Sequence, residues 1–544
     1  MRAHVRVSSA AHRETRNIGL MHAQAVAVTR TGRNRAHDGL LLLACAVVFA
    51  HALYFNHTCD DAYISFRYAY NWAHGHGLVF NRGGFTMGYS NPLWVLLLGL
   101  GERLSVPSPV SARLLGALFT FATLGILSLH LRRHCDRALP AFVALFTIAC
   151  SGVVALWMFG GLEGPLLTFL LARAVLLAID LPAAAPRRAW LELGACLGLA
   201  SLTRPEAILY VAPTCAYLGL RSTERARPTS VALILATALS FYVGLTLWQL
   251  AYYGDPLPNT YYAKHLPLTG ELLGRGMQLT LQYLEAYYWL PLLVCLGFIL
   301  GRQRLGAKRG TLPLSIIACF VAFYLSIGGD ALVYYRMWHV TLPMVALLAA
   351  EIIERLQEAA PPRAFAVTAL ALVLVGGNVP ASFRGWNIEY LRSDDYHLRK
   401  LQHVAAYMRT LPKDTRIAAN VIGILTYGSD LHMVDMLGLT DRHIAKAPGK
   451  QVGTPAHESH DARYVLEQKP DLIIPGFPAL RSAAAEAMPA PMYPADRDLY
   501  ARPELRRDYE SGYLQICNHG ALPVFVRKTY MGLLSEKCDD GAGG

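Results

Sequence analysis

The chain has 544 residues, of which 54% are hydrophobic and only 16% are charged. This composition excludes an ordinary soluble protein of the same length and indicates a polytopic membrane protein. The formal net charge of +12 does not indicate nucleic-acid binding, because the Lys and Arg residues form short clusters between apolar runs. That pattern orients membrane helices.

The N-terminal segment, residues 1–38, is polar and rich in arginine. No small-residue cleavage site follows the first apolar segment, Leu41–Phe55, so we interpret that segment as a retained signal anchor. The sequence therefore predicts a cytoplasmic basic tail over residues 1–38 and a transmembrane region over residues 39–380.

Apolar runs that approach the ~20 residues required by a bilayer recur along the transmembrane region. They predict about eleven transmembrane helices. A shorter run, Pro92–Leu100, is expected to lie at the membrane interface. The predicted spans are 39–56, 110–131, 139–159, 163–182, 189–204, 206–220, 228–252, 286–301, 311–327, 337–354 and 363–380.

Basic clusters in the loops predict the orientation of these spans. Clusters such as Arg132-Arg133 and Arg187-Arg188 fall in alternate loops if residues 92–100 do not span. Because Lys and Arg accumulate in cytoplasmic loops, we expect these loops and the N-terminal tail to be cytoplasmic. The other loops hold the unusual polar motifs and are expected to lie outside, beginning with the first outer loop, residues 57–109.

The composition changes after Val379. Residues 381–544 are polar, and short apolar runs bounded by turn residues alternate with helical stretches, which predicts a soluble α/β domain. The odd number of predicted spans places this domain outside. The predicted strands are 416–421, 433–436 and 471–474, and the predicted helices are 396–409 and 461–468.

Two adjacent aspartates, Asp60 and Asp61, follow the first span. Ionised groups at a membrane edge suggest a functional site. Adjacent residues diverge by ~100° on a helix, so the two carboxylates are expected to have different roles. If a helix begins here, Asp60, Arg67 and Asn71 lie on one face. The alternative is that one aspartate simply caps this helix and interacts with its dipole.

The segment Asp60-Asp61-x-x-Ile64-x-x-Arg67-Tyr68-Ala69-x-Asn71 resembles membrane glycosyltransferases of the GT-C superfamily. More narrowly, it is similar to the branch related to arabinofuranosyltransferases, which build bacterial cell-wall arabinan and decorate pili. One departure is Met87, where that branch often has an acidic residue. Other strings that look like the branch are Gly75-x-Gly77-Leu78, Gly88-Tyr89-Ser90-Asn91-Pro92, Gly161-Leu162-Glu163, Thr203-Arg204-Pro205-Glu206, Pro258-Asn259-Thr260-Tyr261-Tyr262-Ala263-Lys264, Gly328-Gly329-Asp330 and Asp435-Met436-Leu437-Gly438-Leu439-Thr440-Asp441.

The resemblance implies a GT-C fold in the bacterial inner membrane, with the C-terminal domain in the periplasm. It also implies a sugar donor carried on polyprenyl phosphate and transfer to a hydroxyl group of a glycan or protein. A carboxylate can take the acceptor proton, and the departing phosphate is an anion that cations stabilise. Asp60 is the expected base, and Asp61 is expected to orient it or a sugar hydroxyl.

Three cations on the predicted outer side, Arg67, Lys264 and Arg336, are candidates for binding the phosphate or the sugar. The alternative for each is anchoring at the interface, where such side chains snorkel. Lys264 is the strongest candidate because Asn259 and Tyr262 precede it and offer hydrogen-bonding partners.

Further polar residues complete the expected binding set. Arg204 and Glu206 are expected to pair with each other or with a neighbouring loop, and Glu163 could be only a first-turn carboxylate. Asp330 is a candidate sugar or metal contact. No metal ligands are assigned, and a requirement for a divalent cation is left open. The expected donor- or substrate-binding residues are Arg67, Asn71, Glu163, Arg204, Asn259, Tyr262, Lys264, Asp330, Arg336 and His443.

Three alternatives remain open at the level of sequence. The donor could be a hexose such as mannose instead of arabinofuranose. The chain could instead transport a lipid-linked sugar, although the polar motifs lie at one face and no paired halves are visible. It could also be a non-catalytic envelope or motility factor on this scaffold, in which case the aspartates would be dispensable.

Overall fold

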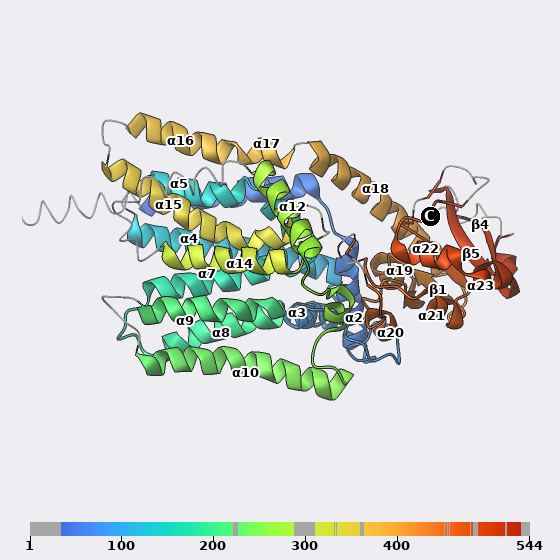
Figure 1. Cartoon of the computed structure of the whole chain (residues 1–544). Helices are drawn as coiled ribbons and strands as arrows, with labels where there is room; N and C mark the ends of the chain where they lie inside the picture. The colour runs from blue at the N-terminus through green and yellow to red at the C-terminus, as the bar shows by residue number, and fades with distance from the viewer. Residues whose placement is uncertain are drawn as a thin grey trace, which may run out of the picture.

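The computed structural model shows a bundle of long helices with a small mixed sheet at one end (Figure 1). It describes residues 34–534 apart from 136, 221–226, 288–309, 331, 333, 360–363, 384, 451, 454, 456, 479, 482–487, 517 and 518. The predicted tail, residues 1–38, and the predicted span 286–301 therefore lie mainly outside the described residues.

The bundle helices follow the predicted apolar runs. Proline begins some of them, as Pro228 does in α10, where its missing N–H has no intrahelical partner to lose. Gly254 ends the same helix in the left-handed conformation, with φ 74°. The bundle elements are Asn34–Phe55, α4 (Ser108–His134), α5 (Ala138–Ala149), α6 (Gly152–Phe159), α7 (Gly164–Asp180), α8 (Arg187–Thr203), η1 (Pro205–Tyr210), α9 (Val211–Leu220), α10 (Pro228–Tyr253), α14 (Thr311–Ser326), η2 (Arg336–Thr341), α15 (Leu342–Ala359), α16 (Ala364–Gly376) and α17 (Asn378–Ser382).

Among the described residues, four helices are long and apolar enough to cross a membrane: Asn34–Phe55, Ser108–His134, Pro228–Tyr253 and Arg336–Glu358. The pair α5 and α6 is bent by 52° and would make a fifth span if it crosses as one unit. Two other helices, α7 and α8, have 17 residues each, which is at the lower limit of a bilayer crossing. The figure of about eleven spans therefore stays a prediction.

Four shorter helices stand between the bundle and the sheet. They are α2 (Asp60–Ala73), α3 (Pro92–Arg103), α11 (Asn259–Lys264) and α12 (Gly270–Ala286). The first matches the helix expected after the paired aspartates. The second covers the run expected at the interface, and it packs against α2 in the structure. Figure 1 shows α2, α3 and α12 at the end of the bundle that faces the sheet. The four helices are called the polar layer below, because they carry Asp61 and Lys264.

The C-terminal segment contains a five-stranded sheet of order β2-β1-β3-β5-β4. Strand β1 pairs in parallel with β2 and β3, whereas β5 pairs antiparallel with β3 and β4. All three predicted strands are present, and β4 and β5 are additional. The elements are α18 (Gly385–Met408), β1 (Arg416–Ala419), α19 (Gly423–Ser429), β2 (His432–Asp435), α20 (Arg442–Ala445), α21 (Ala462–Glu467), β3 (Leu472–Ile474), α22 (Pro494–Ala501), α23 (Pro503–Asp508), β4 (Tyr509–Gln515), β5 (Ala521–Arg527) and η5 (Lys528–Leu534).

The sheet segment is docked on the bundle through α19, which follows the first strand and packs against α2. Gly423, at the start of α19, lies so close to α2 that an added Cβ would be 2.1 Å from the backbone oxygen of Asp60. A glycine is therefore needed at this point of contact. The docking brings the loops of the C-terminal segment over the polar layer.

Candidate active site

A cavity of about 580 Å³ lies in the polar layer, between the bundle and the loops of the sheet segment. It brings together residues from distant parts of the chain because the ends of α2, α8 and α11 and the start of α7 meet there. Six of the predicted site residues line it: Asp61, Glu163, Arg204, Lys264, Asp330 and Arg336. This is the largest gathering of the predicted residues in the described structure.

Asp61 and Lys264 are the unengaged charges of the cavity. Both side chains line it, and neither forms a hydrogen bond or ion pair within the described part of the chain. His457 lies near both: burial lowers its pKa below the ordinary value, the charge of Asp61 opposes this, and the charge of Lys264 adds to it. A carboxylate and an ammonium group are therefore available to a ligand in the same cavity.

Two arginines in the cavity are held by carboxylates. Arg204 lies 2.7 Å from an oxygen of Glu206 and 3.3 Å from an oxygen of Glu163. Arg336 and Asp330 form a two-bonded pair, with both N–O distances 3.0 Å. Such pairs fix the orientation of a guanidinium group. The remaining N–H groups of both arginines can therefore point at an anion with little rearrangement.

The cavity continues into an apolar part. Its lining there includes Leu209, Leu257, Leu268 and Phe323. The side chains of Leu209 and Leu268 are also 43% and 67% exposed on the surface of the molecule. One cavity thus combines a charged region with an apolar region that reaches the outer surface of the bundle.

Asp60 does not line this cavity. Its carboxylate accepts hydrogen bonds from the backbone N–H groups of Gly423 and Ile424, at 3.1 and 2.7 Å. These N–H groups begin α19 and have no partner within that helix, so the carboxylate acts as a cap supplied from another element. Asp60 is therefore a helix cap, as in the alternative drawn from the sequence, but the helix that it caps is α19 instead of α2.

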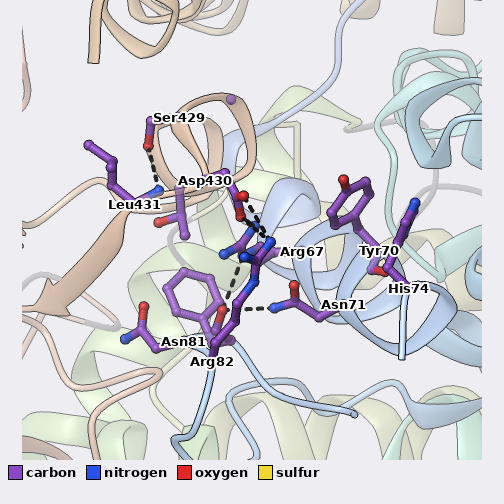
Figure 2. A network of polar contacts seen from close by, with 12 residues as sticks. Arg67, Tyr70, Asn71, His74, Asn81, Arg82, Ser429, Asp430 and Leu431 are labelled. Atoms are coloured by element: carbon purple, nitrogen blue, oxygen red, sulfur yellow. Dashed lines mark hydrogen bonds and ion pairs between the residues drawn. The ribbon is translucent and has the colours of Figure 1, made fainter. Parts of the chain in front are cut away.

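Arg67 and Asn71 do not line the cavity either, and Figure 2 shows the polar contacts that they make elsewhere. Arg67 pairs with Asp430 at 2.5 Å and donates to the carbonyl oxygen of Phe80 at 3.1 Å. Asn71 donates to the carbonyl oxygens of Val79 and Phe80. Both residues fold the loop after α2 back onto this helix, so their contacts are structural.

Asn259 holds the 438–441 loop of the C-terminal segment. Its amide group donates to the carbonyl oxygens of Gly438, Leu439 and Asp441, at 2.8 to 3.1 Å. From the other side, the carboxylate of Asp435 accepts hydrogen bonds from the backbone of the same loop. The loop motif singled out in the sequence therefore forms a rigid wall of the cavity, to which Leu439 contributes directly.

His443 and Tyr262 lie beyond this wall. His443 pairs with Asp461 at 2.8 Å and lines a second, polar cavity of about 770 Å³. The ring of Tyr262 lies 4.5 Å from the ammonium group of Lys446, and its carbonyl oxygen accepts from Lys450. Neither residue reaches the cavity that contains Asp61.

Sequence reasoning missed Arg275, which also lines the cavity. It pairs with Glu458 at 2.8 Å and donates to the carbonyl oxygen of Gly328. The pair joins α12 to the C-terminal segment, and the Glu458 side chain is almost fully buried. A buried carboxylate needs such a cation, but a single arginine on a short amphipathic helix gives no signal for its distant partner.

The fold and the cavity together define a membrane-type helical bundle with a charged cavity at one end. A family model described as "Domain of unknown function (DUF8728)" matches residues 388–518, which is less than half of the chain. No curated protein matches.

Solved structures show a distant likeness in fold. ArnT from Cupriavidus metallidurans bound to undecaprenyl phosphate has a TM-score of 0.48 and 13% identity, over 72% of this chain and 85% of that chain. AglB from Archaeoglobus fulgidus, in complex with an inhibitory peptide and a dolichol-phosphate, has a TM-score of 0.46 and 12% identity, over 73% of this chain and 64% of that chain. At this level of similarity, the function has to be inferred from the chain's own residues.

Proposed function

We propose that the chain is a membrane glycosyltransferase of the GT-C type, which transfers a sugar from a polyprenyl-phosphate donor to an acceptor hydroxyl group. The observation that carries the proposal is the cavity in which Asp61 and Lys264 are both unengaged, beside two arginines held in place by carboxylates. The resemblance in sequence favours arabinofuranose as the sugar. The alternative donor is a hexose such as mannose.

The two parts of the cavity suit the two parts of such a donor. A phosphate group would lie between Lys264, Arg204 and Arg336, where fixed cations stabilise an anion in a partly water-free site. The prenyl chain would follow the apolar lining toward the exposed side chains of Leu209 and Leu268. A soluble nucleotide-sugar has no prenyl chain that would occupy this apolar part of the cavity.

Asp61 takes the role of base in this proposal. The acceptor oxygen attacks the anomeric carbon of the sugar and gives its proton to the Asp61 carboxylate. The bond between that carbon and the phosphate oxygen breaks, and its electron pair leaves with the polyprenyl phosphate. Lys264 and the two arginines stabilise the added negative charge. Asp60 acts indirectly, because its cap on α19 holds the start of α2 in place.

The topology is part of the same proposal. About eleven spans would cross the membrane, with residues 1–38 in the cytoplasm, residues 39–380 in the bundle and residues 381–544 in the periplasm. One basic cluster of the described residues supports this orientation, because it lies at the side opposite the cavity: α4 begins near α3 and ends at Arg132, Arg133 and His134.

The test compares transfer by Asp61→Asn and Asp60→Asn variants at matched abundance in membranes. The donors are synthetic polyprenyl-phosphate arabinofuranose and polyprenyl-phosphate mannose, each with a radiolabelled sugar. We expect transfer by the wild type and by Asp60→Asn, since asparagine can still cap a helix. Asp61→Asn should lose about 100-fold or more of the rate. Equal rates in wild type and Asp61→Asn would remove this base from the mechanism.

A binding measurement separates a wrong sugar from a wrong function. Polyprenyl phosphate is the shared product for any sugar, so its binding to the detergent-solubilised protein does not depend on the sugar's identity. Binding of polyprenyl phosphate without transfer from either donor would support a polyprenyl-phosphate donor that carries a different sugar. No saturable binding, together with no transfer, would favour the non-catalytic alternative.

A further inference from the structure

A compact group of possible metal ligands lies at the end of the bundle opposite the cavity. His130 and His134 are four residues apart on α4 and therefore share one face of that helix. Their ring centroids are 4.5 Å apart. Asp180 is the last residue of α7, and its two oxygens lie 3.0 Å from Nδ1 of His130 and 2.9 Å from Nε2 of His134.

The geometry points to a site for one divalent transition-metal ion, of the Zn²⁺ class, held by His130, His134 and Asp180. One donor atom from each residue lies within 4.8 Å of the others. Bonds of about 2.0–2.2 Å place two ligands of one zinc ion roughly 3–4 Å apart, so small side-chain movements are sufficient. Two imidazoles and one carboxylate suit Zn²⁺, Co²⁺ or Ni²⁺, whereas Mg²⁺ and Ca²⁺ prefer oxygen ligands alone.

The surroundings of the group support a cation. Asp180 pairs with both histidines and with no Lys or Arg of the described residues. Its side chain is only 23% exposed, and that of His130 is 8% exposed. A half-buried carboxylate is stable when a positive charge compensates it. Here that charge comes from protons on the imidazoles or from a metal ion that replaces them.

The site is also accessible. The His134 side chain is 25% exposed, so an ion can enter from solvent and keep a water molecule as a further ligand. Once bound, the ion would join the ends of α4 and α7. The other end of α7 follows Glu163 in the cavity, so the ion would anchor a helix that helps to form the active site. This role is structural and is independent of the proposed transfer reaction.

The experiment measures Zn²⁺ binding by the full chain, purified in detergent without a histidine tag and stripped with a chelator. Bound metal is quantified by elemental mass spectrometry during a Zn²⁺ titration. The variants are Asp180→Asn, which has the same size as the original, and His134→Gln. The control is His74→Gln, a substitution of an exposed histidine whose one hydrogen bond within the described structure is to the carbonyl oxygen of Tyr70.

We expect the wild type and the control to hold one more Zn²⁺ than Asp180→Asn and His134→Gln. Loss of a ligand should weaken the affinity of this site by about 100-fold or more. The midpoint of thermal unfolding should rise with Zn²⁺ in the wild type and the control, because an ion that binds only the folded state stabilises it. Substituted Co²⁺ should show visible absorption bands that the two variants lack.

The result that overturns the site is equal metal binding in the wild type and both variants, or no metal bound by the wild type. The three residues would then form a network of hydrogen bonds only. Size-exclusion profiles check that the variants are folded. Because Asp180→Asn keeps a hydrogen-bonding group in place, loss of metal in a well-folded Asp180→Asn protein is assigned to the missing ligand.

Discussion

The carboxylate of Asp60 accepts a 2.7 Å hydrogen bond from the backbone N–H of Ile424, although the two residues are 364 positions apart. This contact joins the start of α2 to the C-terminal segment. The next residue, Asp61, faces the cavity and makes no such bond. One member of the pair therefore positions the segment that carries the other.

The first prediction concerns this cap. We expect Asp60→Ala to destabilise the docking of α19 by about 1 kcal/mol, which is the usual effect of losing a capping side chain. Asp60→Asn keeps one acceptor oxygen and so one of the two hydrogen bonds, and it should lie between Asp60→Ala and the wild type. Hydrogen exchange of the Gly423 and Ile424 amides measures the effect directly. Protection that is unchanged in Asp60→Ala would show that the cap contributes nothing.

The second prediction concerns Lys264. Lys264→Ala should weaken the binding of polyprenyl phosphate by about tenfold or more, since a partly buried cation bound to a phosphate contributes roughly 1.5–3 kcal/mol. Lys264→Arg should retain part of the affinity because it keeps the charge. The control is Lys413→Ala, which removes an exposed lysine outside the cavity. Equal losses in Lys264→Ala and Lys413→Ala would indicate an effect of net charge alone.

The third prediction concerns the ion pair between Arg67 and Asp430. The Arg67 side chain is 3% exposed, so Asp430→Ala leaves a buried guanidinium group without its partner. We expect a loss of about 2 kcal/mol or more in stability, toward the range measured for broken buried pairs. Arg82→Ala removes the exposed cation that shares Asp430 and should cost less than about 1 kcal/mol.

Thermal unfolding in detergent, monitored by proteolysis of the C-terminal segment, distinguishes Asp430→Ala from Arg82→Ala. Figure 2 shows both arginines meeting the same carboxylate, so Asp430→Ala removes both ion pairs, whereas Arg82→Ala removes only the exposed one. Asp430→Ala also places alanine at a residue with a left-handed φ of 62°. Similar unfolding midpoints for Asp430→Ala and Arg82→Ala would show that the buried pair adds nothing to stability beyond the exposed pair.

The fourth prediction is a pH dependence caused by Asp435. Burial raises the pKa of this carboxyl group to about 6, despite the hydrogen bonds that it accepts from Thr440 and Leu437. An unfolded aspartate has a pKa of about 3.9, so the folded state binds more protons between these values. The group's contribution to stability is complete below about pH 4 and is lost as the pH rises through about 6.

The size of this loss is about 3 kcal/mol, from a shift of roughly two units. It is measured as the difference in unfolding free energy between the wild type and Asp435→Asn, at pH 4.5 and again at pH 7. At pH 7, the wild type should be less stable relative to Asp435→Asn than it is at pH 4.5. Other carboxylates titrate in both proteins and cancel, so parallel pH profiles would contradict a raised pKa for Asp435.

The polar residues show which parts of the site were predictable. Asp61, Lys264 and Arg204, which come from separate motifs, line one cavity. Asp60, Arg67 and Asn259 come from motifs of the same kind but hold backbone or carboxylate groups instead. A sequence motif indicates that a polar residue is needed at a position. It does not indicate whether that residue binds a ligand or another part of the chain.

The sequence by itself determined the apolar runs, the helix after Leu41–Phe55 and the strands after Val379, because periodicity and composition act over short distances along the chain. Only the tertiary structure decided which aspartate faces the cavity. That choice depends on the docking of α19 against α2, between segments more than three hundred residues apart. The N–H groups at the start of α19 bind the nearer carboxylate, and the adjacent one is turned toward the cavity by the ~100° rotation between neighbouring residues on a helix.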